Sequence, residues 1–181
     1  PVPLPKGVEL TQAGGKVRIT TSMVAGCWLL PPILARLQAE EPAIAVELVT
    51  SNQLTNLLRR EADIAVRMVR PTQASLVARK LGEVAICAAA HRDYLARAGT
   101  PRRPEDLLRH RLIGYDRDDT IERGMAAMGF VIPRQQFVLR TDDQVADGRW
   151  VAAGAGIGFV ARYDIGHWPG VEAILPLLWI P

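Results

Sequence analysis

Side chains suited to covalent chemistry are few in this sequence, and their spacing argues against catalysis. A Ser-His-Asp hydrolase holds its nucleophile beside a base, but Ser22, Ser51 and Ser75 all lie outside any G-x-S-x-G turn. The histidines are scattered, and Cys27 and Cys87 lack the spacing of metal ligands. There is no G-x-x-x-x-G-K-[ST] phosphate loop. We therefore expect a protein that is not an enzyme and that requires no metal and no cofactor.

Polar residues at the starts of predicted helices are better candidates for binding a ligand. In a sheet of parallel strands, helix N-termini gather at the carboxyl ends of the strands, where ligands bind. Their free N–H groups favour a carboxylate or a phosphate. Three such starts are Thr21-Ser22-Met23, Thr50-Ser51-Asn52-Gln53 and Thr141-Asp142-Asp143. Ordinary N-capping is the alternative role for each of them.

Arg67, at the end of the third predicted strand, is the best charged partner for an anionic ligand. Its guanidinium could pair with a carboxylate through two hydrogen bonds, and an ordinary surface arginine is the alternative. Arg117 and Asp118 follow a predicted strand that ends at Tyr115, and a solvated turn is the simpler interpretation of them. Asp142 or Asp143 is more typical of the cap of the helix that runs to Ala153 than of a ligand group.

Size and composition narrow the function classes. A chain of 181 residues with 49% hydrophobic and 23% charged residues is typical of one soluble globular domain or two small ones. The net charge is +3, but the arginines are dispersed, whereas nucleic-acid binders concentrate positive charge on one face. No secretory leader or membrane-spanning apolar run is visible. With only two cysteines, we expect a cytoplasmic location and no DNA binding by this chain alone.

Hydrophobic periodicity predicts an α/β protein. The first part alternates strands at 17–21, 44–49 and 63–67 with helices at about 30–41 and 53–60, the pattern of a parallel sheet with crossover helices. Residues 76–81 and 84–89 read as two strands around a turn. A second α/β unit is predicted with strands at 111–115, 136–140 and 157–161 and helices at 91–98, 104–108, 121–128 and 143–153. The fold class expected is α/β, with two interleaved lobes joined by crossover strands.

Five sequence segments occur in an informative order between residues 15 and 180. They are G-K-V-R-I at 15–19, L-P-P-I-L at 30–34, E-P-A-I-A-V-E-L at 41–48, L-L-R-R-E-A-D-I-A-V-R at 57–67 and G-A-G-I-G at 154–158. Together they resemble the effector-binding (substrate-binding) domain of LysR-type transcriptional regulators, although Arg60 or Glu61 stands where that family commonly has glycine. The resemblance implies two Rossmann-like lobes of the type II periplasmic-binding-protein fold.

The same resemblance divides the chain. Residues 1–14 resemble the wing of a winged helix-turn-helix domain, or are a linker tail. Residues 15–89 would form the first lobe and 90–162 the second. Residues 163–181 would return to the first lobe, without the final strand and helix that are usual in the family.

The resemblance also implies a function. A small anionic effector would bind between the lobes and alter the geometry of a homodimer or homotetramer, and promoter DNA would be bound only by an N-terminal helix-turn-helix domain that this chain lacks. No membrane partner is expected. The ligand-binding candidates are Thr21, Ser22, Met23, Thr50, Ser51, Arg67, Arg117, Asp118 and Thr141. The alternative is a transporter's solute-binding protein with the same fold, against which the lack of a signal peptide counts.

Overall fold

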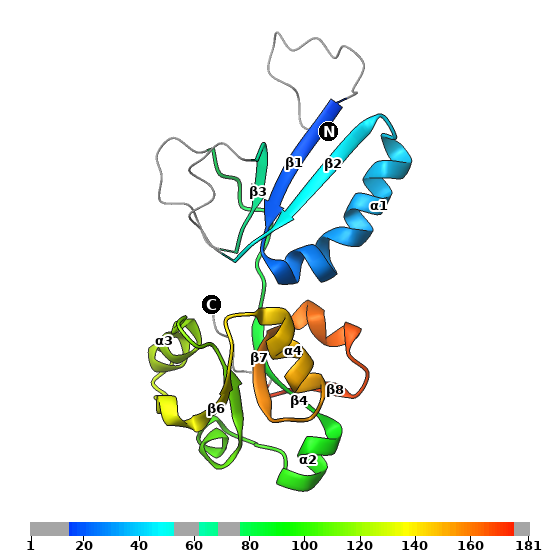
Figure 1. The fold of residues 1–181 in the computed structure, drawn as a ribbon. Coiled ribbons are helices and arrows are strands. Elements are labelled where there is room, and N and C mark those ends of the chain that lie inside the picture. Colours follow the sequence, from blue (N-terminus) through cyan, green and yellow to red (C-terminus); the bar gives the residue numbers. More distant parts are fainter. Residues whose placement is uncertain (1–14, 53–61, 69–76, 176–181) are drawn as a thin grey trace. The chain divides into compact units, whose positions relative to one another are not determined.

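The computed structural model describes residues 15–52, 62–68 and 77–175. The chain forms two compact units, residues 1–69 and 70–181, which are described separately (Figure 1). The predicted helix at 53–60, the wing-like segment before Gly15 and the end of the chain after Leu175 lie outside the described residues.

The first unit contains a parallel three-stranded sheet, as predicted. Strands β1 (Gly15–Thr21), β2 (Ile44–Thr50) and β3 (Ile64–Val66) lie in the order β2-β1-β3. Helix α1 (Leu30–Glu40) connects β1 to β2 and begins at the predicted residue. Because the strands are parallel, their carboxyl ends meet at one edge of the sheet.

A π-helical turn, η1 (Ala25–Leu29), precedes α1 and was not predicted. It brings the backbone at Gly26 close to the end of β2, since a Cβ atom on Gly26 would lie 2.4 Å from Cγ2 of Thr50. Only glycine fits here without displacing that threonine side chain. The helical segment therefore starts next to the carboxyl edge of the sheet.

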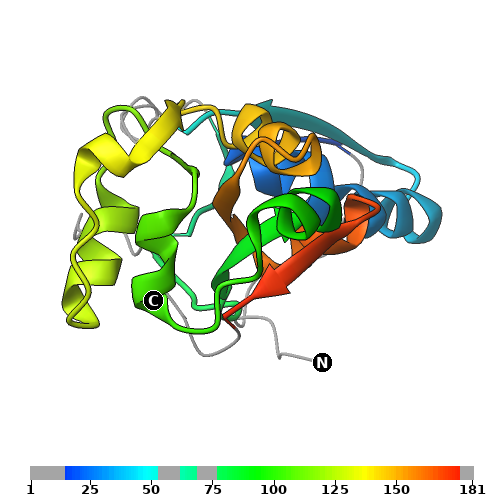
Figure 2. The same cartoon turned by 90° about the horizontal axis from the view of Figure 1, so that it is seen from below.

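The second unit is built on a mixed five-stranded sheet in the order β6-β5-β7-β4-β8, with β8 at one edge (Figure 2). Its strands are β4 (Ile86–His91), β5 (Leu112–Gly114), β6 (Phe137–Arg140), β7 (Ile157–Ala161) and β8 (Val171–Ile174). Strand β5 is parallel to β6 and β7, whereas β4 is antiparallel to β7 and β8.

Helices and short 3-10 turns connect these strands. The α-helices are α2 (Arg92–Ala98), α3 (Thr120–Ala127) and α4 (Gln144–Ala152). The 3-10 turns are η3 (Pro104–Arg109), η4 (Arg134–Gln136) and η5 (Arg162–His167). The core of this unit is formed by apolar residues of the central strands, of α2 and α3 and of η3, among them Leu107, Leu112, Ile121, Met125, Ile157 and Phe159.

Two features of the second unit differ from the prediction. Residues 77–85 form no strand, so the predicted hairpin around Gly82 is wrong; they have no partner strand, and β4 pairs instead with β7 and β8. Strand β8 was not predicted. Because β4 and β8 belong to this sheet, the observed division falls at residue 69 rather than 89, and residues 163–175 belong to the second unit.

The glycines of the G-A-G-I-G segment have structural roles. Gly154 ends α4 with φ +70, a conformation that favours glycine. A Cβ atom on Gly156 would lie 2.5 Å from the backbone oxygen of Arg111, and one on Gly158 would lie 2.4 Å from Cγ2 of Val151. These residues therefore let the chain turn out of α4 and let α4 pack closely on the sheet.

Among the described residues, no helix has the length and apolar character needed to cross a membrane. The same residues contain no group of three or more histidine, cysteine, aspartate or glutamate side chains that could hold a metal ion.

Candidate functional site

The candidates of the first unit gather at the carboxyl edge of its sheet. The register sets Thr21 of β1 opposite Thr50 of β2 on one side and Val66 of β3 on the other. The residues that follow these three strand ends are Ser22, Ser51 and Arg67. The structure thus brings together side chains that are up to 46 positions apart in the sequence numbering, from 21 to 67.

Arg67 is a half-buried cation held by neutral groups. Its Nη1 atom donates a hydrogen bond to the backbone oxygen of Ser51 at 2.5 Å, and Nη2 donates to Oγ1 of Thr20 at 2.8 Å. Its Nε atom is buried and has no hydrogen-bond partner in the described part of the chain. Burial lowers the pKa of this guanidinium, but an arginine stays charged at neutral pH.

Two threonines of β1 complete the surroundings of Arg67. Thr20 is buried and accepts the hydrogen bond just described. Thr21 is fully buried, and its Oγ1 atom has no hydrogen-bond partner among the residues that the structure describes. A buried hydroxyl without a partner costs free energy, so this edge of the sheet holds two polar groups that a ligand could satisfy.

The helix start after β1 is occupied by protein groups. Oγ of Ser22 accepts a hydrogen bond from the backbone N of Ala25 at 3.3 Å, which is an N-cap contact. The backbone N of Met23 donates to Oδ1 of Asn52 at 3.1 Å, so the amide predicted to be free is already bonded. The backbone N of Ser51 donates to the oxygen of Thr21 at 2.8 Å. Asn52 belongs to one of the predicted helix starts but was not among the ligand-binding candidates.

In the second unit, Asp142 organises the loop that follows β5. Its Oδ1 atom accepts hydrogen bonds from the backbone N atoms of Asp116, Arg117 and Asp118, at 2.9, 2.9 and 3.4 Å. The exposed Arg117 side chain forms an ion pair with Asp142, with Nε 3.6 Å from Oδ2. These hydrogen bonds lower the pKa of Asp142, which stays ionised. Arg117 therefore already has an acidic partner.

The remaining second-unit candidates act at helix starts. Oδ1 of Asp118 accepts from the backbone N of Thr120 at 2.8 Å, just before α3. Oγ1 of Thr141 accepts from the backbone N of Asp143 at 3.0 Å. Asp143 caps α4 through two backbone N–H groups of its first turn, at 2.9 and 3.1 Å, as predicted. Local capping thus explains the polar groups of Asp118 and Thr141.

Two buried carboxyl groups in the second unit were missed by the sequence analysis. Asp147 of α4 and Asp164 of η5 are each 2% exposed, and Oδ1 of each has no hydrogen-bond partner in the described residues. Burial raises the pKa of each to about 7. Burial and the charges of these two acids also raise the pKa of Tyr115. The sequence carried one sign that Asp147 is buried: it lies four residues before Val151, so both side chains lie on the same face of α4, which packs against the sheet at Gly158.

Comparison with known proteins shows which family this chain matches. Residues 11–178 match the family described as "LysR substrate binding domain". The "HTH-type transcriptional activator AaeR" of Escherichia coli strain K12 is 30% identical over 170 residues, which cover 92% of this chain and 50% of that protein. The chain therefore spans about half the length of that relative.

Solved structures agree. The regulatory domain of CrgA, "a LysR-type transcriptional regulator from Neisseria meningitidis", matches with a TM-score of 0.77 and 25% identity, covering 92% of this chain and 83% of that one. The "Cofactor-Binding Domain of the Cbl Transcriptional Regulator" matches with a TM-score of 0.75 at 22% identity, covering 97% and 81%, and shows the shared fold.

Proposed function

This chain belongs to the LysR substrate binding domain family, and on that premise we propose that its effector is a small anion that alters how the protein assembles. The family supplies the two-lobed, periplasmic-binding-protein-like fold. In this proposal the ligand is bound by Thr21, Ser22, Met23, Thr50, Ser51 and Arg67 of the first unit. The second-unit candidates Arg117, Asp118 and Thr141 are engaged by contacts within their own unit and are left out of the proposed site.

The observation that carries the proposal is the environment of Arg67. Among the described residues, no acidic side chain forms an ion pair with it, although burial makes an uncompensated charge costly. Both terminal nitrogens hold neutral oxygens of the protein, which fixes the position of the guanidinium. The buried Nε–H group has no partner among the described residues, and a guanidinium can bind a carboxylate through two parallel hydrogen bonds.

The buried hydroxyl of Thr21 adds specificity to this site. A ligand that accepts or donates a hydrogen bond there would satisfy a group that otherwise has no partner in the described chain. Ser22 and Met23 contribute less, because their polar groups are engaged by Ala25 and Asn52. Selectivity among anions would therefore depend mainly on the strand ends rather than on the helix start.

The proposed regulatory step is a shift between arrangements of the oligomer. A ligand shifts such an equilibrium only to the extent that it binds one arrangement more tightly than the other. Promoter DNA would be bound by a helix-turn-helix domain elsewhere in the whole protein, as the name of the AaeR relative suggests. A transporter's solute-binding protein is not favoured, because the named relatives are transcriptional regulators.

A thermal-shift screen against aromatic acids, amino acids, keto acids and sugar phosphates tests the proposal. A ligand that binds only the folded state stabilises it by about 2.7 kcal/mol at a hundredfold excess over Kd. We expect a saturable rise in Tm with one class of anion and its loss in Arg67→Gln. Arg36→Gln is the matched control, because Arg36 is exposed on α1 and also belongs to the first unit. Stabilisation that survives in Arg67→Gln would contradict the assignment of this arginine.

A further inference from the structure

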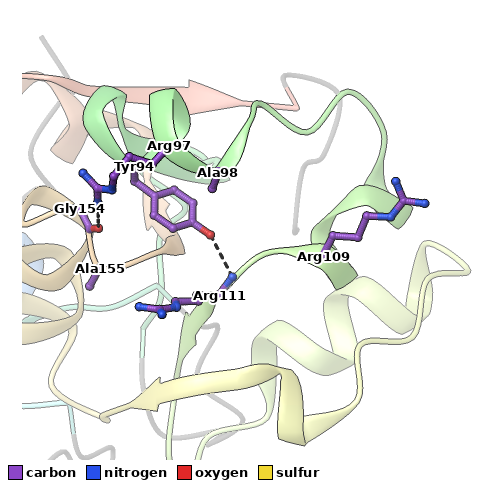
Figure 3. A pocket seen from close by; sticks show the side chains of 7 residues that line it. All are labelled: Tyr94, Arg97, Ala98, Arg109, Arg111, Gly154 and Ala155. Carbon is purple, nitrogen blue, oxygen red and sulfur yellow. Dashed lines mark hydrogen bonds between the residues drawn. The ribbon is translucent and has the colours of Figure 1, made fainter.

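The second unit has a pocket of about 310 Å³ whose walls carry an excess of positive charge. Arg97, Arg109 and Arg111 line it together with Tyr94 and the Gly154–Ala155 turn (Figure 3). The side chains of Arg97 and Arg111 extend toward that turn, whereas the exposed side chain of Arg109 extends away from them. The proposed effector site does not use any of these residues.

Three separate elements contribute the arginines that line the pocket. Arg97 lies in the last turn of α2, Arg109 ends η3, and Arg111 directly precedes β5. Nη2 of Arg97 donates a hydrogen bond to the backbone oxygen of Gly154 at 3.3 Å, which ties α2 to the end of α4. The pocket thus lies at the amino end of β5, whereas the loop held by Asp142 follows the carboxyl end of that strand.

The floor of the pocket is a fixed and uncharged network. The hydroxyl of Tyr94 accepts a hydrogen bond from the backbone N of Arg111 at 2.9 Å and lies 3.3 Å from Nδ1 of His110. Burial lowers the pKa of His110, which favours its neutral form, with Nδ1 accepting the hydroxyl proton of Tyr94. The network holds Tyr94 and the start of β5 in place without offsetting the arginine charges.

Within the described residues the three pocket arginines have no counter-ion, and the same holds for Arg92, Arg102, Arg140, Arg149 and Arg162 of this unit. Arg103, Arg117, Arg123 and Arg134 each form an ion pair with an acidic side chain. Within the described residues, no ion pair involves the pocket arginines. The ends of α2 and α4 contribute only partial negative charges. Like charges brought together around one pocket repel each other, and a bound anion removes that cost.

We propose that this pocket is a second ligand site, which binds a compact oxyanion such as phosphate or sulfate, or the phosphoryl group of a small metabolite. Guanidinium groups bind such anions through charge-assisted, often paired hydrogen bonds. The side chains of Arg109 and Arg111 form no hydrogen bond within the described protein, so their donors are available to the anion. A bound anion would link α2, η3 and the turn after α4.

A small anion suits this pocket better than a nucleic acid. The pocket has a volume in the range of small-molecule sites. A nucleic-acid surface needs a row of basic groups along the backbone of the polymer, whereas Arg97, Arg109 and Arg111 line one pocket.

Calorimetric titration of the chain with inorganic phosphate at low ionic strength tests the proposal. We expect one phosphate per chain, competition by sulfate, and no effect of chloride at matched ionic strength. Arg111→Gln should raise Kd at least about tenfold, the usual loss for one charge-assisted hydrogen bond, whereas Arg109→Gln should have a smaller effect because its side chain extends away from Arg111. Arg140→Gln is the matched control, because this exposed arginine sits opposite Gly114 at the other end of β5.

Five outcomes decide whether an anion binds in this pocket. No saturable phosphate binding, or equal weakening in Arg140→Gln, would overturn the proposal. The proposal would also be overturned if phosphate did not bind while a 20-base-pair DNA duplex bound in a way that depends on Arg111. That result would indicate a nucleic-acid contact instead. Phosphate binding lost in Arg67→Gln but kept in Arg111→Gln would place the anion at the proposed effector site instead. Binding of a sugar phosphate far tighter than that of phosphate, and dependent on Arg111, would support the site and identify a metabolite as its source.

Discussion

Replacing the buried Asp147 by asparagine should change how the stability of the second unit depends on pH. Asp147 is 2% exposed, and one of its carboxyl oxygens has no hydrogen-bond partner among the described residues. Burial raises its pKa from 3.8 to about 7. Between these values the folded protein holds a proton on Asp147 that the unfolded chain has released. Stability therefore falls as the pH rises through this window and stays low above about 7.

The size of the effect follows from the pKa difference. One pKa unit corresponds to about 1.4 kcal/mol. Between about pH 5.5 and the folded-state pKa of about 7, Asp147 therefore removes about 2 kcal/mol from the free energy of unfolding. Asparagine cannot ionise and has nearly the same shape. The Asp147→Asn variant should gain about 2 kcal/mol relative to the wild type on going from about pH 5.5 to about pH 8.5. Asp164 titrates in both proteins and cancels in the comparison.

Urea unfolding followed by tryptophan fluorescence measures this difference. A Trp28→Phe background leaves only tryptophans of the second unit, so the signal reports that unit. Glu172→Gln is the matched control, because Glu172 is an exposed carboxyl group on β8 of the same unit. If the difference between Asp147→Asn and the wild type is the same at both pH values, Asp147 is ionised throughout and the reasoning from burial is refuted.

Two further variants test how the pocket region is built. Gly156→Ala places a Cβ atom 2.5 Å from the backbone oxygen of Arg111, so urea unfolding should show that the free energy of unfolding falls by at least about 2 kcal/mol. Gly166→Ala is the control, because a Cβ atom there has nothing within 4 Å, and it should change this free energy by less than about 0.5 kcal/mol. Equal losses in the two variants would contradict the packing argument. Tyr94→Phe removes the hydroxyl that joins the backbone amide of Arg111 to the ring of His110. The free energy of unfolding should fall by about 1–3 kcal/mol in the same assay. An unchanged urea midpoint would show that this network contributes nothing to stability.

The elements that could be predicted are those with a strong local pattern. The alternation of apolar residues at 17–21 and 44–49 predicted β1 and β2, and the helical spacing after Leu30 predicted α1. Residues 76–81 were also predicted to form a strand, but strand structure needs a partner strand, and the structure describes none for 77–85. Strand β8 is only four residues long and depends on pairing with β4, so its local pattern was too weak to identify it.

The candidate site was predictable in part, because it follows from the predicted parallel strands. Arg67 and the serines at the strand ends could be named because a parallel sheet places the carboxyl ends of its strands along one edge. Which of their polar groups are free was not predictable. The amide of Met23 is bonded to Asn52, which is 29 positions away. The side chain of Arg117 is paired with Asp142, 25 positions away, so only folding brings these partners together.

The amino-acid sequence alone determined the α/β class, the family resemblance and the row of polar residues that ends β1, β2 and β3. Those features depend on periodicity and short motifs, which are local. The tertiary structure decided that, among the described residues, Arg67 has only neutral oxygens as hydrogen-bond partners, that Asp147 and Asp164 are buried, and that three arginines from three elements line one pocket. Burial and counter-ions depend on which distant segments pack together, and for this reason charge and pKa could be assigned only from the folded protein.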